Sequence, residues 1–157
     1  MVEVAQARLR DRPVVEAFLH GNNALRVARR GELVTSMDHP ALLAWSGDEL
    51  VGAATYIITG PACEVLTLHA RSRFGGTGSA LLASLVDTAR RAGCTRLWVV
   101  TTNDNVDALR FYQRRGFRLV RLRPGAVRES RSLKPEIPDL GAHGIELRDE
   151  LELEMDL

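Results

Sequence analysis

The sequence predicts an α/β (α+β) fold in which a mixed β-sheet is flanked by helices. Short runs rich in β-branched and aromatic residues alternate with amphipathic helical patterns, and glycine or proline marks most of the boundaries between them. The length of 157 residues and the hydrophobic content of 45% suit one globular core. We therefore expect a single domain over residues 1–157.

The first forty residues predict a strand, a helix and a less certain segment. Residues 2–8 alternate weakly between apolar and polar, as a first strand would. The run DRP at 11–13 is typical of a helix start, with a side-chain cap and an early proline, and the helix should extend to about His20. Residues 24–40 fit a short strand or a hairpin around Arg30-Gly31.

The middle of the chain predicts three successive strands. They cover residues 41–45, 50–59 and 64–69, and turn residues separate them at 46–49 and 60–61. Two helix–strand pairs follow. The helices are predicted at 77–92, closed by Gly93, and at 105–115, closed by Gly116; the strands are predicted at 96–101 and 117–122.

The end of the chain combines an irregular segment with a clear strand pattern. Residues 123–144 contain proline and glycine and predict a long connection of the kind that often has a function. From 145 to 157 apolar residues occupy alternate positions with charges between them, which predicts a strand with one wet face. Asp149 interrupts the apolar series, so we expect a bulge or a bend there.

The composition excludes several classes of function. A net charge of +1 and an aromatic content of 5% do not favour a nucleic-acid binder. Cys63 and Cys94 lack metal spacing, are too few for a disulfide scaffold and should be buried thiols. The chain has neither an apolar stretch of spanning length nor a signal-peptide pattern, so we expect a cytoplasmic protein without a membrane partner.

A glycine-rich run between a predicted strand and a predicted helix is the first feature that indicates chemistry. The run 73–79 (RFGGTGS) would present backbone N–H groups and a helix N-terminus to an anion, and Arg73 could add a charged contact. Its spacing matches neither the P-loop nor the dinucleotide fingerprint. By itself, this run would be equally compatible with a tight turn.

The spacing R-x-x-G-x-G at Arg73, Gly76 and Gly78 resembles the acyl-CoA pyrophosphate loop of the GNAT family of acetyltransferases. A second block is similar to another motif of that family: Asn105-x-x-Ala108-x-x-Phe111-Tyr112-x-x-x-Gly116-Phe117. The resemblance covers residues 41–122 well. It implies a mostly antiparallel sheet, acetyl-CoA (coenzyme A) as co-substrate without a metal, and an N-acetyltransferase that acylates an amine by direct attack on the thioester.

Further similarity to a bacterial subgroup of this family, one without an established acceptor, lies at 101–105, 125–138 and 144–152. The family resemblance also implies where the cofactor binds, through a strand that splays from its neighbour, the phosphate loop and the following motif. The implied cofactor-binding residues are Leu66, Leu68, Ala70, Arg73, Phe74, Gly75, Gly76, Thr77, Gly78, Ser79, Asn105 and Ala108. The Leu68 N–H is the implied donor to the oxyanion.

Three side chains are candidates for proton transfer. Tyr112 would protonate the leaving thiolate, and Asn105 could cap the helix that carries it. Glu64 would be the general base; by strand alternation it should share a side with Leu66 and Leu68. His69 is a competing base, and the same alternation predicts that it points to the opposite face.

Several alternatives stay open at this stage. The chain could be a non-catalytic acyl-CoA-binding or regulatory module rather than an enzyme. The acceptor is an unknown amine, from a small molecule or a protein. A homodimer through the last strand is possible, since exposed edges invite pairing. A basic run could bind the 3′-phosphate of CoA or an acidic acceptor, or form a solvated face: Arg121, Arg123, Arg128, Arg131 and Lys134.

Overall fold

A long antiparallel hairpin of strands β5 (Glu49–Thr59) and β6 (Ala62–Ala70) organises the first half of the chain. The computed structural model describes residues 2–71 and 75–157, which form a seven-stranded, mostly antiparallel sheet and four α-helices. This confirms the predicted fold class. The chain divides into two compact units, made of residues 1–25, 35–97 and 157, and of residues 26–34 and 98–156.

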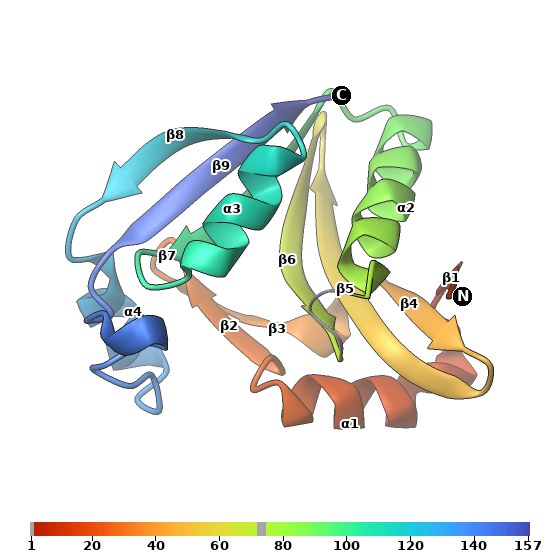
Figure 1. The fold of residues 1–157 in the computed structure, drawn as a ribbon, viewed down its shortest axis with the longest axis horizontal. Coiled ribbons are helices and arrows are strands. Elements are labelled where there is room, and N and C mark those ends of the chain that lie inside the picture. The colour runs from red at the N-terminus through yellow and green to blue at the C-terminus, as the bar shows by residue number, and fades with distance from the viewer. Residues whose placement is uncertain (1, 72–74) are drawn as a thin grey trace. The chain divides into compact units, whose positions relative to one another are not determined.

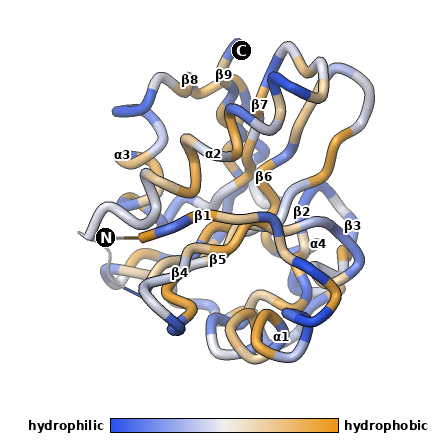
Figure 2. The backbone as a smooth tube through the Cα atoms, turned by 90° about the vertical axis from the view of Figure 1, so that its right-hand side faces the viewer, coloured by the Kyte–Doolittle hydropathy of each residue, from blue (hydrophilic) through white to orange (hydrophobic). Residues whose placement is uncertain are grey.

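In the first unit the strands follow the order β1-β4-β5-β6, and each pair is antiparallel. Strands β1 (Glu3–Gln6) and β4 (Ala41–Ser46) lie on the far side of β5 from β6. Helix α1 (Arg12–Gly21) and helix α2 (Thr77–Arg91) lie on opposite sides of β4 and β5 (Figures 1 and 2). Two short 3₁₀ helices, η1 (Leu9–Asp11) and η2 (Ser36–Asp38), precede α1 and β4.

The two helices cover two different faces of the hairpin. Toward α1 the core contains Val15, Phe18 and Leu19 of the helix against Leu43 and Ala53 of the strands, all of them buried. Figure 2 shows this hydrophobic layer as orange segments of β4 and β5 above α1. Since neighbouring residues of a strand point to opposite faces, odd-numbered positions of β5 near Ala53 face α1 and even-numbered ones face α2.

Strand β6 contains one residue more than the stretch of β5 opposite to it. Thr55 pairs with Thr67, while the next residue, Tyr56, pairs with Val65. Leu66 is therefore the extra residue of a β-bulge, which disrupts the ladder locally and bends the strand. The bulge also shifts the alternation of β6 by one position, so the facing of its side chains must be read from the partners on β5.

The second unit contains the β2–β3 hairpin, strands from one end of the large sheet, and two α-helices. The hairpin β2 (Arg26–Arg29) and β3 (Glu32–Thr35) turns at Arg30-Gly31, where both residues have positive φ, at 54° and 75°. The remaining strands are β7 (Arg96–Thr102), β8 (Arg118–Arg123) and β9 (Glu150–Asp156), and β9 lies between the other two. The helices are α3 (Val106–Arg114) and α4 (Ala126–Leu133), and a 3₁₀ turn, η3, spans Ala142–Gly144.

Strands β8 and β9 pair arginine with glutamate along one face. The cross-strand pairs are Arg118–Glu154, Arg121–Glu152 and Arg123–Glu150. The three arginines share a face although their spacing in the sequence is uneven, because the register shifts between Leu119 and Arg121. Opposite charges directly across a ladder stabilise the pairing.

Part of this charged face is buried and holds the β2–β3 turn. Both oxygens of Glu150 accept a hydrogen bond from the Arg30 backbone N–H, at 3.2 and 3.3 Å. Glu152 forms ion pairs with Arg30 Nε at 3.6 Å and Arg123 Nη2 at 3.2 Å. The Arg30 guanidinium also stacks 4.7 Å from the centre of the Trp98 ring. Glu150 and Glu152 are therefore buried with partners, as buried charges require.

Three sequence expectations need correction. Residues 123–144 are not irregular throughout, because α4 lies within them. The last strand begins at Glu150 rather than 145, because the chain before it forms an isolated bridge between Leu140 and Glu146 and docks on Asn103. Asp11 does not cap α1 with its side chain; its carboxylate accepts from the Arg8 N–H at 2.8 Å instead. The hairpin around Arg30-Gly31 is confirmed.

Close packing of α2 on β5 leads to the first prediction. A Cβ on Gly52 would lie 2.7 Å from Thr77 Cγ2, 2.9 Å from Leu81 Cδ1 and 3.1 Å from the His69 carbonyl oxygen. We expect Gly52→Ala to lower the free energy of unfolding by about 1–3 kcal/mol, because the start of α2 must move. Gly21→Ala, with nothing within 4 Å of its Cβ, should leave stability unchanged or slightly higher. Urea unfolding of both variants tests this, and equal losses would contradict it.

Candidate active site

In the first unit, the predicted phosphate loop leads into α2 as expected. Gly76 is the N-cap of the helix with a left-handed φ of +81°, and Gly75 and Gly76 are exposed. The first turn of α2 contains no acidic side chain. A helix start of this kind directs its first N–H groups and the positive end of its dipole toward an anion. Arg73 and Phe74 lie outside the described residues.

The remaining predicted loop residues form the first turn of α2. Thr77 is buried against Gly52, while Gly78 and Ser79 are half-buried. Exposed glycines followed by a helix leave the backbone accessible to a phosphate, and the buried Thr77 holds that backbone against the sheet. The first turn thus has an accessible outer side and an inner side packed on β5.

The predicted facing of Glu64 is wrong. Glu64 pairs with Ile57, Thr67 with Thr55 and His69 with Ala53, so these three side chains of β6 share the face toward α1. Leu68 and Ala70 pair with Ala54 and Gly52 and share the face toward α2. The bulge at Leu66 is the physical reason, because it reverses the alternation between Glu64 and Leu68.

The shared face forms a stripe of polar groups that are mostly buried. Glu64 is 3% exposed and Thr67 is 5% exposed. The Thr55 and Thr67 hydroxyls are hydrogen-bonded at 2.6 Å. Further along the stripe, His69 is half-buried, and its Nδ1 atom is buried without a hydrogen-bond partner among the described residues. Burial lowers the pKa of His69, so its ring is neutral at pH 7.

In the second unit, α3 carries the other predicted group. The Asn105 side chain caps the helix by accepting from the Ala108 N–H at 3.1 Å, which confirms its predicted capping role. Tyr112, two turns further, is 5% exposed and packs edge-on against Phe111 and Phe117, with ring centres 5.2 and 5.1 Å away. Burial raises the pKa of Tyr112, so the phenol stays protonated throughout the neutral range.

The turn between β7 and α3 holds the segment 139–149, a role that the sequence did not reveal. Asn103 Oδ1 accepts from the N–H groups of Arg148 and Asp149, both at 3.0 Å, and its Nδ2 donates to the Glu146 carbonyl at 2.8 Å. Asp104 is 6% exposed and accepts from the Ala142 N–H at 2.8 Å.

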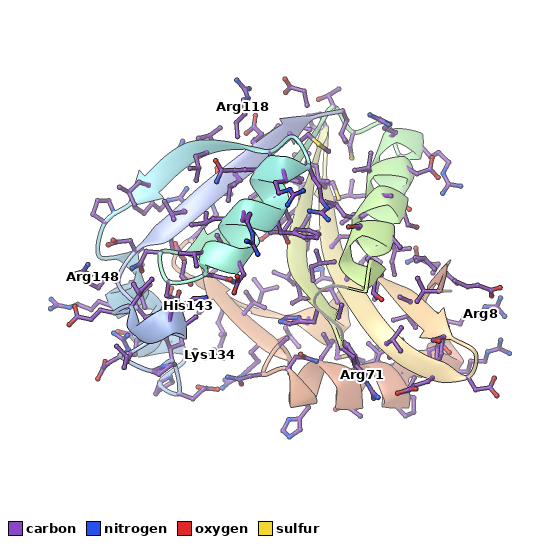
Figure 3. All side chains as sticks on the ribbon, viewed as in Figure 1. Arg8, Arg71, Arg118, Lys134, His143 and Arg148 are labelled. Atoms are coloured by element: carbon purple, nitrogen blue, oxygen red, sulfur yellow. The ribbon has the colours of Figure 1, made fainter. Side chains whose placement is uncertain are left out.

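A second contact of the same segment involves a histidine. His143 Nε2 lies 3.1 Å from Asp107 Oδ2, and Figure 3 shows His143 beside the start of α3. His143 has a positive φ of 58°. Both side chains are partly exposed, so the pair adds little to stability. Together with the Asn103 and Asp104 contacts, it ties the segment to the helix that carries Tyr112.

The basic run at 121–134 is largely used for internal contacts. Lys134 is buried, donates to the Arg26 carbonyl at 2.7 Å and has a pKa lowered by burial. Arg131 donates to the carbonyls of Ile137, Pro138 and Leu147. Arg123 pairs with Glu152. These side chains therefore hold the α4 region together instead of forming one basic surface.

Comparison with known proteins is decisive for the family. The acetyltransferase (GNAT) family model matches residues 5–117, which is more than half of the chain. The chain belongs to the GNAT family of acetyltransferases. It is 44% identical over 103 residues to the uncharacterized protein YdhI of Bacillus subtilis (strain 168), a match over 66% of this chain and 64% of YdhI. The match thus spans slightly less than two thirds of that relative's length.

Solved structures of GNAT acetyltransferases share the fold at lower sequence identity. The IAA acetyltransferase from Bacillus cereus ATCC 14579 superposes with a TM-score of 0.76 and 22% identity over the whole of both chains. A Bacillus subtilis acetyltransferase in complex with CoA gives a TM-score of 0.73 at 19% identity, over 100% of this chain and 99% of that one. At these identities the similarity establishes the GNAT fold.

Two further features are absent from the described residues. Over 2–71 and 75–157, no helix is both long and apolar enough to cross a membrane. Within the same ranges, no group of three or more His, Cys, Asp and Glu side chains is arranged to hold a metal ion. Cys63 and Cys94 are buried free thiols, as predicted.

The docking of the 139–149 segment leads to the second prediction. Asp104→Ala removes the buried acceptor of the Ala142 N–H and of the Thr102 hydroxyl. We expect the free energy of unfolding to fall by about 1–3 kcal/mol and the Ala142 amide to exchange faster. Asp139→Ala is the matched control, because the Asp139 carboxylate is 97% exposed. Denaturation and hydrogen exchange by NMR measure both effects; unchanged exchange at Ala142 would refute the docking role.

Proposed function

We propose that this GNAT protein is an N-acetyltransferase that transfers the acetyl group of acetyl-CoA to an amine acceptor. The observation that carries the proposal is the bulge in β6 together with the glycine-capped start of α2, the next helix along the chain. The bulge leaves backbone groups of a central strand outside the regular ladder, and the helix start offers an anion site a few residues later. These two features suit a donor that carries a pyrophosphate at one end, for the helix start, and a thioester at the other, for the strand.

The bound CoA in one related structure and the family description support the same donor. For this chain, the residues proposed to hold the pyrophosphate are Arg73, Phe74 and the loop from Gly75 to Ser79. Leu66, Leu68 and Ala70 of β6 are proposed to contact the pantetheine arm through their backbone. Asn105, the N-cap of α3, and Ala108 within the helix complete the proposed set. No metal is needed, because backbone N–H groups supply the positive potential.

Four events make up the proposed reaction. The acceptor nitrogen attacks the thioester carbonyl carbon, and the carbon–nitrogen bond forms. The carbonyl oxygen becomes an oxyanion, for which the Leu68 N–H is the proposed donor; one such donor lowers a barrier of this type by about 3 kcal/mol. The carbon–sulfur bond then breaks. Finally, the nitrogen loses a proton and the thiolate gains one.

Tyr112 is proposed to protonate the thiolate. Its burial keeps the phenol neutral, so a proton is available at every pH at which the reaction would run. Glu64, a buried carboxylate on the central strand, is one of two candidate bases for the amine and would act through water; His69 is the other. The facing of Glu64 toward α1, opposite to α2 with the phosphate loop, separates the proposed acceptor side from the donor side of the strand.

The function is tested by binding and turnover together. Calorimetry with CoA and acetyl-CoA should give one site per chain. A thiol-release assay with polyamines, amino acids, aminoglycosides and short peptides with free N-termini should find at least one amine that is acetylated. Binding without turnover across this panel would favour a non-catalytic acyl-CoA-binding or regulatory module. Absence of CoA binding would refute both alternatives.

The role of Tyr112 gives the next prediction. Tyr112→Phe removes the proton donor and keeps the ring, so kcat should fall about 10²–10⁴-fold, as for loss of a general acid, while the Kd for acetyl-CoA changes little. Tyr56 is the matched control, because it is the other tyrosine of the chain and its hydroxyl donates to Gln6 instead. Tyr56→Phe should retain the wild-type rate. A fully active Tyr112→Phe enzyme would exclude the assignment.

A further inference from the structure

We propose that His69 takes the proton from the acceptor amine, an assignment that rests on the proposed function. The strand alternation in the sequence places His69 on the face opposite to Glu64, but the register shows the two on one face. That face looks toward α1, whereas the helix that begins at the phosphate loop lies on the other. His69 is thus positioned to meet an acceptor that approaches from the side away from α2.

Glu64 and His69 cannot both accept a proton directly from the same amine nitrogen. Their partners on β5, Ile57 and Ala53, are four residues apart, so the two side chains begin about 13 Å from each other. The hydrogen-bonded hydroxyls of Thr55 and Thr67 lie between them. At most one of the two groups can therefore act directly at the amine.

His69 is less buried than Glu64 and is therefore the group that an amine can reach directly. Its Nδ1 atom is buried with no hydrogen-bond partner in the described part of the chain. A buried polar atom left unpaired costs about 1–3 kcal/mol, and such atoms are rare in folded proteins. The lowered pKa keeps the ring in its neutral form, which is the form that accepts a proton. Glu64, in contrast, is almost fully buried at 3% exposure and already engaged in contacts.

Few other charges face His69. Among the described residues of β4, β5 and β6, Glu64 is the other titratable side chain on this face. The buried side of α1 presents Val15, Phe18 and Leu19. Arg71 and Glu49, at the strand ends, are exposed and pair with each other. A change in the charge of His69 should therefore be visible as a separate step in the pH dependence.

The amine nitrogen forms its bond to the acyl carbon and loses one proton to the neutral imidazole, which becomes imidazolium. The carbon–sulfur electron pair leaves with sulfur, and the thiolate takes one proton from the Tyr112 phenol. Return of a proton from the imidazolium to the phenolate through solvent restores both groups. The net products are the acetamide and free CoA.

The kinetic test compares His69→Gln with Glu64→Gln, using the amine from the panel that is acetylated fastest. We expect His69→Gln to lower kcat about 10²–10⁴-fold with little change in the KM for acetyl-CoA. The wild-type plot of kcat/KM against pH should fall on the acidic side with a pKa below 6.5, and this fall should disappear in His69→Gln. His20→Gln, on the exposed side of α1, is the control and should behave as wild type.

An acceptor-independent measurement covers the case in which no panel amine reacts. The four histidine ring resonances are titrated by NMR with and without acetyl-CoA. Bound acetyl-CoA should shift the resonance and the pKa of His69 and leave those of His20 unchanged. An unperturbed His69 would overturn the proposal.

The outcomes separate this proposal from the function on which it rests. Wild-type turnover together with full activity and an unchanged pH profile in His69→Gln would refute the role of His69 and leave the acetyltransferase intact. Loss of activity in Glu64→Gln but not in His69→Gln would also refute the role of His69 and would identify Glu64 as the base. Failure of the wild-type protein to bind acetyl-CoA would refute the function itself.

Discussion

The extra residue in β6 is the constraint on which the candidate site depends. One unpaired residue, Leu66, interrupts the ladder with β5 and reverses the alternation of side chains along the strand. Without it, Glu64 and His69 would face opposite sides of the sheet, and the hydroxyl pair of Thr55 and Thr67 could not form part of one stripe with them. In the proposed function, the same irregularity also frees backbone groups of this central strand for the donor.

The second unit depends on a different kind of contact. Arginine and glutamate pairs along β8 and β9 set the register, and the buried members of this ladder hold the distant turn at Arg30. The 139–149 segment docks on Asn103 and Asp104 by backbone N–H and carbonyl contacts. Tyr112 is therefore carried by a helix whose start is braced by a segment that contains little regular structure. Loops can be held as rigidly as strands when side-chain amides and carboxylates satisfy their backbone groups.

Many of the helices and turns could be predicted from the sequence, because they follow from patterns of neighbouring residues. Helical periodicity located α2 and α3, glycines marked their ends, and Asn105 was identifiable as a cap. The hairpin at Arg30-Gly31 was visible as a turn. The features that could not be predicted are those set by contacts between segments far apart in the sequence or by weak local patterns. The register that produces the bulge at Leu66 depends on β5, the helix α4 is short and polar, and the contacts of Asn103 reach across more than forty residues.

The facing of His69 relative to Glu64 was predicted wrongly because strand alternation is least reliable beside functional sites. Alternation assumes an unbroken ladder, but bulges concentrate beside functional sites, where they redirect side chains. Alternation counted across the bulge therefore gave the wrong relative facing for Glu64 and its competing base His69. For β6 the correction moves a neutral, partly buried imidazole onto the same face as the carboxylate. Since Glu64 and His69 share a face, they differ as candidate bases in their position along the strand and not in the face of the sheet that they occupy.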